Sequence, residues 1–256
     1  MMQPESRRVF LTLASAGLAL GACRKDIQGS KVDPEPSIPP PAASAPTPQK
    51  DDEGEADDVS AVEDLMREHG VIRRILVVYR ESAARLRAKA ASVPAEALQS
   101  AAQLMQAFGE NYHEKLLEEA HLFPAIKKAG GPAAGLIDPL LAQHQRGREI
   151  TDYVISVTRG PVGVGSAEPL ARALEGFARM YEAHAAQEDT IVFQAWKKSM
   201  SKKQLNEMGD LFEDIEHKTF GKDGFDDASQ KITAIEASLG ITLAGMTPPS
   251  PPPSTK

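Results

Sequence analysis

The chain has 256 residues, of which 41% are hydrophobic, 25% are charged and only 5% are aromatic, an ordinary balance for a soluble globular protein. Its net charge of −7 disfavours a general nucleic-acid binder, so no nucleic-acid partner is expected. A single cysteine excludes an intrachain disulfide and any metal site built from several cysteines.

The first 22 residues have the pattern of an export signal. Arg7 and Arg8 precede an apolar run from Val9 to Ala22, which is shorter than the ~20 residues that a membrane-spanning helix needs. The run ends in Leu-Gly-Ala before Cys23, which resembles the lipobox of bacterial lipoproteins, and its start resembles a twin-arginine signal. These resemblances imply a protein of the bacterial cell envelope, anchored to a membrane by lipid on Cys23 and facing the periplasm or exterior. The alternatives are an ordinary basic signal region and a free thiol.

Two proline-rich stretches flank the remainder of the chain. Seven prolines lie between Pro34 and Pro48, five lie between Pro248 and Pro253, and an acidic run occupies residues 51–58. Such sequences favour extended conformations and cannot bury a core. Residues 23–58 are therefore predicted to form a tether, and residues 247–256 a disordered tail.

The region between these stretches is predicted to be all-α. Alanine, leucine and charged helix formers dominate it, and its apolar residues recur at helical spacing. The pattern predicts four long helices, which with their mostly short connections form an antiparallel up-down bundle over residues 59–200. The predicted long helices span 59–91, 94–128, 132–158 and 169–200. Two shorter helices, at 202–220 and 226–239, are predicted in a C-terminal extension over 201–246.

Polar residues interrupt the apolar stripes of this bundle. His69, His144 and His184 each occupy an apolar stripe on a different predicted helix, and Glu188 does the same. A lone histidine there is usually a hydrogen-bonded core residue, but an ionised glutamate is rarely buried unless it is paired or binds a metal. The stripe of the fourth helix is predicted to comprise Leu170, Leu174, Phe177, Tyr181, His184, Glu188 and Ile191. Three histidines and a carboxylate facing one core indicate a metal site.

The second predicted helix contains a related pair at a longer spacing. His113 and Glu118 are five residues apart, which places them about 140° apart around a regular helix. The apolar pattern slips backwards between these two residues, as one inserted residue absorbed in a π-turn would cause. The spacing therefore predicts a wide turn that brings both side chains to the metal site. One alternative is that Glu114, Glu118 and Glu119 form a solvated face. The other is a regular helix in which Glu114 or Glu119 points outward and only one of His113 and Glu118 binds.

These motifs resemble the hemerythrin-like, or HHE cation-binding, family over about residues 60–200. The family pattern has a histidine on the first helix, a His-x3-Glu before Leu-Phe-Pro, a histidine on the third helix and a second His-x3-Glu. The resemblance implies a non-heme di-iron centre with bridging oxo or hydroxo groups, and the same donors also suit manganese or zinc. The ligands that it implies are His69, His113, Glu118, His144, His184 and Glu188.

Two departures and three neighbouring residues bear on this interpretation. The His113–Glu118 spacing is one residue too long, and Arg148 stands where oxygen-carrying hemerythrins have a further histidine. A reversible oxygen carrier of the invertebrate type is therefore not the expected function. His217 is a possible additional ligand, although a surface position is favoured because it points away from its own apolar stripe. Tyr112 and Tyr181 are possible hydrogen-bond donors around the ligands, with core packing as the alternative.

Three classes of function follow from the sequence. The leading interpretation is a lipid-anchored di-iron protein that binds or senses dioxygen or a related small oxidant. The second is a di-iron enzyme of nitric oxide or peroxide detoxification, or of iron–sulfur cluster repair. The third is a metal-free helical scaffold lipoprotein. The sequence contains no nucleotide-binding fingerprint or Ser-His-Asp arrangement that names a substrate.

Overall fold

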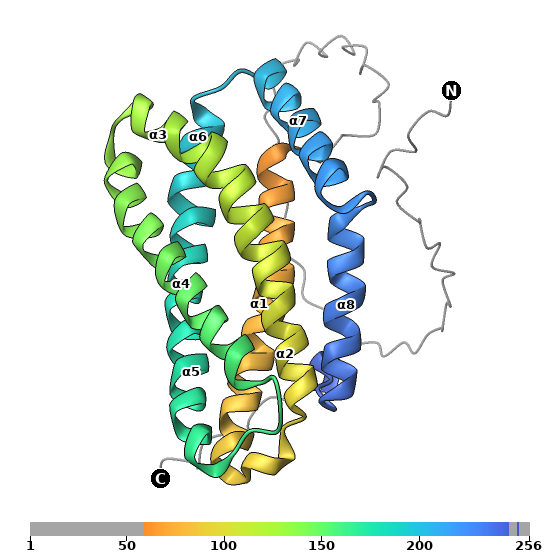
Figure 1. Ribbon diagram of the computed structural model, residues 1–256. Coiled ribbons are helices and arrows are strands. Elements are labelled where there is room, and N and C mark those ends of the chain that lie inside the picture. The colour runs from red at the N-terminus through yellow and green to blue at the C-terminus, as the bar shows by residue number, and fades with distance from the viewer. Residues whose placement is uncertain (1–58, 246–249, 251–256) are drawn as a thin grey trace, which may run out of the picture. The chain divides into compact units, whose positions relative to one another are not determined.

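Four antiparallel bundle helices, together with two packed C-terminal helices, form the fold of this computed structural model, which describes residues 59–245 and residue 250. Successive bundle helices run in opposite directions (Figure 1). The predicted all-α bundle is confirmed, and the described residues contain no β-strand. The predicted signal segment and tether lie outside the described residues, as does the predicted tail apart from Ser250.

Two of the bundle helices are regular and two change their winding part-way along. The first and third are α1 (Ala61–Ala88) and α4 (Ile137–Val157), the latter preceded by the short η3 (Pro132–Leu136). The second bundle helix comprises α2 (Ala95–Leu104), the π-helical η2 (Met105–Leu122) and α3 (Phe123–Ala129). The fourth comprises α5 (Val164–Gln187), the π-helical η4 (Glu188–Val192) and α6 (Phe193–Lys198). A short η1 (Ala90–Ser92) joins the first two bundle helices.

Local sequence signals account for where these helices begin and end. Ser60 caps α1 by accepting a hydrogen bond from the Glu63 backbone N–H, while the Glu63 carboxylate accepts one from the Ser60 N–H. This reciprocal pairing satisfies two N–H groups that would otherwise lack a partner within the helix. Gly130 and Gly131 follow α3 with φ angles of 74° and 81°, a conformation in which a side chain would be strained. They allow the chain to turn sharply into the third bundle helix.

The fourth bundle helix begins earlier than predicted. It starts at Val164 rather than at Pro169, and Pro169 lies inside α5. The predicted beginning of this helix was therefore wrong by five residues. Near the beginning of a helix a proline sacrifices at most one backbone hydrogen bond, so the helix can extend upstream of it.

The predicted apolar stripe of this helix was also wrong at its last position. Ile191 is 43% exposed, whereas the next residue, Val192, is fully buried. The cause is η4, whose wide π-turn shifts the helical phase by about one residue after Glu188. Because both residues are apolar, the sequence pattern fits either phase.

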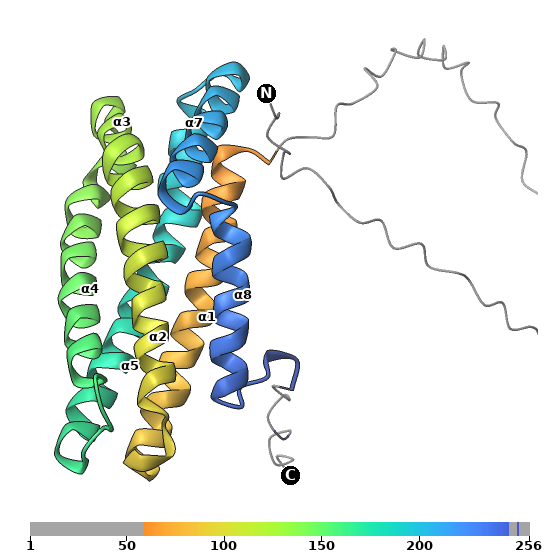
Figure 2. The ribbon, with the colours of Figure 1, turned by 45° about the vertical axis from the view of Figure 1, so that its right-hand side comes forward.

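The C-terminal helices cover one side of the bundle. α7 (Lys202–Phe220) packs against α1 and η2, and α8 (Gly224–Ser238) packs against α1 and α2, as Figure 2 shows. Gly221, at φ 68°, ends α7, and the buried Glu216 carboxylate accepts a hydrogen bond of 2.8 Å from the Phe225 backbone N–H. A final turn, η5 (Leu243–Gly245), follows α8.

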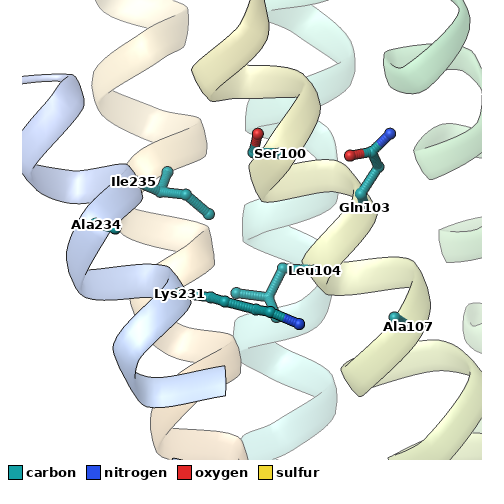
Figure 3. Close-up of a pocket in the computed structure, with 7 residues that line it drawn as sticks. All are labelled: Ser100, Gln103, Leu104, Ala107, Lys231, Ala234 and Ile235. Atoms are coloured by element: carbon teal, nitrogen blue, oxygen red, sulfur yellow. The ribbon is translucent and has the colours of Figure 1, made fainter. Parts of the chain in front are cut away.

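A surface pocket lies between α2 and α8 (Figure 3). Ser100, Gln103 and Leu104 line it from α2, and Lys231 and Ile235 line it from α8. It contains one charged side chain and no cluster of titratable residues. Within the described part of the chain, no helix is both long and apolar enough to cross a membrane.

Candidate metal centre

The six residues predicted as ligands come together in the bundle core. They lie on all four bundle helices, and every one of them has no exposed surface. α1 supplies His69, η2 supplies His113 and Glu118, α4 supplies His144, and the fourth bundle helix supplies His184 and Glu188. The side chains predicted from four separate segments therefore share one buried site.

Each of the two carboxylates lies between two imidazoles. Glu118 faces one histidine with each of its oxygens, while Glu188 faces two histidines with the same oxygen, Oε2. The separations are 3.4 Å for His113 Nε2–Glu118 Oε1, 3.4 Å for His144 Nε2–Glu118 Oε2, 3.5 Å for His69 Nε2–Glu188 Oε2 and 2.9 Å for His184 Nε2–Glu188 Oε2. Two ligands at right angles on one ion, each at ~2.1 Å, would be about 3 Å apart, so these spacings suit shared metal ions.

Most inward-facing atoms lack a hydrogen-bond partner, whereas the Nε2 atoms of His144 and His184 lie 3.1 Å from each other. Buried atoms without a partner include His69 Nε2, His113 Nε2 and both carboxylate oxygens of Glu118 and of Glu188. Leaving such atoms unsatisfied in a core is costly, particularly for carboxylates. Nitrogen and oxygen donors in this arrangement match the ligand preferences of first-row metal ions. The residues present therefore fit a centre of two metal ions.

The outer nitrogen of every histidine is held by a hydrogen-bond acceptor. The Nδ1 atoms lie 2.7–2.9 Å from side-chain oxygens that come from other helices. The pairs are His69 with Asp189, His113 with Glu68, His144 with Glu119 and His184 with Gln143. A hydrogen on each Nδ1 donates to these oxygens, which leaves each Nε2 free to bind a metal ion.

Two phenylalanines stack on histidines of the site. The Phe193 ring lies 5.3 Å from that of His69 at an interplanar angle of 21°, and the Phe123 ring lies 5.5 Å from that of His144 at 18°. Both phenylalanines follow a carboxylate ligand by five residues and begin the helix after a π-helical segment. Each phenylalanine packs against one face of its imidazole and restricts the rotation of that ring.

The wide turn predicted between His113 and Glu118 is present and is longer than expected. The π-helix extends over all of η2, and at its end the Phe123 N–H bonds to the Glu118 carbonyl, five residues back. Buried residues recur along it with a period between four and five, at Met105, Gly109, His113, Glu118 and Leu122. The alternative of a solvated acidic face is wrong, because Glu114 and Glu118 are fully buried and only Glu119 is partly exposed.

Opposite charges compensate one another among the residues of this site. Burial opposes charge on His113, but Glu118 and Glu68 outweigh it and raise the pKa of His113 well above its usual value. Burial likewise opposes charge on Glu118, but His113 and His144 hold the pKa of this carboxyl well below its usual value. The pKa of His144 rises to about 10, because Glu114, Glu118 and Glu119 outweigh the effect of burial. A metal ion bound here would replace protons on these residues.

Comparison with known proteins agrees with this geometry. The sequence profile of the hemerythrin HHE cation-binding domain matches residues 60–196. The chain belongs to the hemerythrin HHE family. Its curated relatives include an uncharacterized protein of Mycobacterium bovis and two of Mycobacterium tuberculosis, each 44% identical over 193 residues that cover 74% of this chain and 74% of the relative. No solved structure matches the chain.

The residue that departs from the oxygen-carrying hemerythrins does not face the metal site. Arg148 forms an ion pair with Glu119 and another, at 3.0 Å, with Glu114. Through Glu119 it is linked to the outer nitrogen of His144. At this sequence position the HHE domain therefore has an arginine that pairs with the outer carboxylates, in place of a further histidine ligand.

The three residues considered as additional site residues have different positions. His217 lies on an exposed face of α7, 3.9 Å from Glu213, and is not brought to the metal site. The Tyr112 hydroxyl donates to Glu68 at 2.9 Å, and the Tyr181 hydroxyl donates to Glu114 at 3.1 Å. Both tyrosines are buried and donate to carboxylates that surround the histidines. They therefore act as hydrogen-bond donors around the site as well as packing in the core.

The acceptors that orient the histidines were not among the residues predicted from the sequence. These residues are Glu68, Glu119, Gln143 and Asp189, and each directly precedes or follows a proposed ligand in the chain. Each holds a histidine of a different helix, so pairing them requires the three-dimensional arrangement of the bundle. Their signal in the sequence is a polar residue adjacent to a ligand, which alone does not separate them from solvated residues.

Proposed function

We propose that this HHE protein binds two iron ions in the buried cluster and uses them to bind or sense dioxygen or a related small oxidant. One observation carries the proposal. Four imidazole Nε2 atoms and two carboxylates converge in the core, while every Nδ1 is turned outward to an acceptor. Histidine and carboxylate ligands of this kind suit iron, and they also suit manganese or zinc.

The number of protein ligands supports a role in small-molecule binding. Six side chains, even with both carboxylates shared, do not complete two six-coordinate ions. When bound, iron supplies open coordination positions and a change of oxidation state. The chain's own residues hold the imidazoles in one tautomer, surround the site with buried aromatic rings and keep bulk water out.

Metal analysis and optical spectroscopy test this function on the purified chain. Two iron ions per chain, together with a near-ultraviolet charge-transfer absorption that changes on adding dioxygen, are the expected results. Iron absent from protein that has been offered ferrous iron anaerobically would contradict the proposal. Consumption of many equivalents of peroxide or nitric oxide would instead identify an enzyme, because a binder or sensor takes up its ligand only once per site.

We further propose that the domain acts at the cell envelope. The support comes from the sequence, in which Arg7 and Arg8 precede an apolar run that ends at Cys23. In this arrangement lipid on Cys23 anchors the chain to a membrane, and residues 23–58 connect the anchor to the helical domain. A folded domain that carries a metal suits the twin-arginine route, which exports folded proteins.

A further inference from the structure

The metal site contains two pairs of histidines whose rings have the same relative arrangement. We call His69 and His113 position 1, and His144 and His184 position 2. The two rings of position 1 have their centroids 4.7 Å apart at an interplanar angle of 54°, and the two rings of position 2 have the same separation and the same angle. The two ring pairs therefore do not distinguish the positions, although the carboxylates do: both Glu118 and Glu188 are grouped with the histidines of position 2, and Glu118 with those of position 1.

In each position, one histidine has a carboxylate as its outer partner, so these two partners carry the same charge. In both cases a carboxylate accepts from the histidine Nδ1 and is itself paired with an arginine on the same helix as that histidine. Asp189 lies 2.7 Å from His69 and is paired with Arg73, and Glu119 lies 2.8 Å from His144 and is paired with Arg148. Each set contains one carboxylate and one arginine, so the charges of these two sets do not distinguish the positions.

The other histidine in each position has partners of different charge. His113 donates from Nδ1 to the Glu68 carboxylate at 2.7 Å, whereas His184 donates to the Gln143 amide oxygen at 2.9 Å. Glu68 and Gln143 occupy equivalent places, because each directly precedes the histidine that its own helix contributes to the site. A carboxylate acceptor makes an imidazole a stronger electron donor than a neutral amide does.

A further carboxylate lies near position 2 but forms no hydrogen bond with a histidine of that position. Glu114 lies 3.9 Å from His144 Nδ1, beyond hydrogen-bond distance, and it is shared between the Tyr181 hydroxyl and Arg148. It therefore does not accept the imidazole hydrogen. Glu68 has no arginine or lysine ion partner among the described residues, so its charge acts on His113.

We propose that the two positions bind divalent metal ions unequally, that position 1 fills first, and that Glu68 and Gln143 set the order. The inference rests on the proposed function and adds to it the roles of two positioning residues. Exchanging an outer partner of a metal-bound histidine typically changes metal affinity by about 10–100-fold. We therefore expect two binding steps whose dissociation constants differ by at least ~10-fold.

Titration of the metal-free full chain with Co²⁺, followed by calorimetry and by visible ligand-field absorption, tests the order of filling. Glu68→Gln is expected to weaken the first step by ~10-fold, and Gln143→Glu to strengthen the second by a similar factor. Gln143→Glu is the safer variant for folding, because Gln143 is only partly buried. The double variant Glu68→Gln/Gln143→Glu is expected to restore two unequal steps with the positions exchanged.

Ligand variants assign each step to a position. In the wild-type background, His113→Ala is expected to remove the tight step and His184→Ala the weak step, and this assignment should reverse in the double variant. Two equal steps in the wild type, or steps unaffected by both Glu68→Gln and Gln143→Glu, would overturn the inference while leaving metal binding intact. Absence of any Co²⁺ or iron binding would instead contradict the proposed function. The control is Glu207→Gln, an exposed substitution on α7, which should leave both binding steps unchanged.

Discussion

The fourth-helix pair illustrates how a single side chain can be tested as a metal ligand. His184 and Glu188 are fully buried, and their Nε2 and Oε2 atoms lie 2.9 Å apart. Replacing either with alanine is expected to reduce bound iron to one ion per chain or fewer, and to lower the melting temperature of the iron-loaded protein. Both effects should appear together, because the site is part of the core.

A matched control separates this effect from general destabilisation. His217→Ala removes an exposed histidine on α7 and should change neither iron content nor melting temperature. Iron content measured by elemental analysis, alongside thermal unfolding, provides both readings. Full iron loading of His184→Ala and of Glu188→Ala would show that these residues are ordinary core residues.

Glu110 gives a pH-dependent prediction outside the ligand set. It is buried on η2, and burial raises its pKa to about 7 against the opposing effects of Thr151 and Arg148. The unfolded chain releases this proton near pH 4.5, whereas the folded chain retains it up to about pH 7. Folded protein therefore binds more protons across this range, and the contribution of Glu110 to stability falls as the pH rises.

Glu110→Gln should remove that loss of stability. At pH 8 the variant is expected to be more stable than wild type by roughly 1–3 kcal/mol, whereas at pH 4.5 the two should be similar. Chemical unfolding of metal-free protein at both pH values measures the difference, with Glu207→Gln as an exposed control. An equal difference at both pH values would show that the pKa of this carboxyl group is the same in the folded and unfolded chain.

Among the elements, the π-helical η2 decides whether the second motif can contribute both of its ligands. Its wider winding places His113 and Glu118, five residues apart, on one face. Deleting Leu117 would restore the four-residue spacing found between His184 and Glu188, and would leave the register of the flanking helix unchanged. We expect this deletion to retain two iron ions per chain, with some loss of stability because Leu117 is buried.

The matched deletion lies in the fourth bundle helix. Ala186 is exposed and lies in the regular helix between His184 and Glu188. This segment has no extra residue in a wide turn, so the deletion cannot be absorbed by closing such a turn. Deleting it should turn Glu188 away from His184 by about 100° and abolish binding of two ions. Equal iron content in the two deletion variants would contradict the role assigned to the wide turn.

The two π-helical segments also show how far the sequence predicts this site. The turn after His113 was predictable, because the extra residue shifts both Glu118 and the following apolar stripe out of the helical register of the preceding residues. The turn at Glu188–Val192 was not, because it follows the ligand pair and exchanges Ile191 for Val192 in the core. The ligands themselves lie on apolar stripes, but Glu68 and Gln143 depend on which helix faces which, and helical periodicity does not contain that information.

For the whole molecule, export and anchoring depend on residues that precede the helical domain. Replacing Arg7 and Arg8 with lysine is expected to leave precursor in the cytoplasm, because the twin-arginine pair would be lost while the basic charge is kept. Cys23→Ala should instead abolish lipidation. Cell fractionation and mass measurement of the N-terminal segment follow both outcomes, and normal membrane attachment of both variants would contradict the envelope proposal.

Metal binding and folding are coupled through the same bundle core. Without metal, the carboxylate oxygens of Glu118 and Glu188 are buried without hydrogen-bond partners, and the compensation comes from protons on nearby histidines. A ligand that binds only the folded chain stabilises it by about 4 kcal/mol at a free concentration 1,000 times its dissociation constant. For a domain of this size that corresponds to a shift of roughly 8–16 °C in the melting temperature.

Iron-loaded protein should therefore unfold at a markedly higher temperature than the same protein after anaerobic chelation, and adding ferrous iron back should restore the difference. Glu118→Gln supplies the comparison, because it preserves the size of the side chain but removes the charge that lies between His113 and His144. Chelation should shift the melting temperature of this variant much less. Equal shifts in both proteins would show that the stabilising ion binds elsewhere. No shift in either protein would show that metal binding does not stabilise the folded bundle.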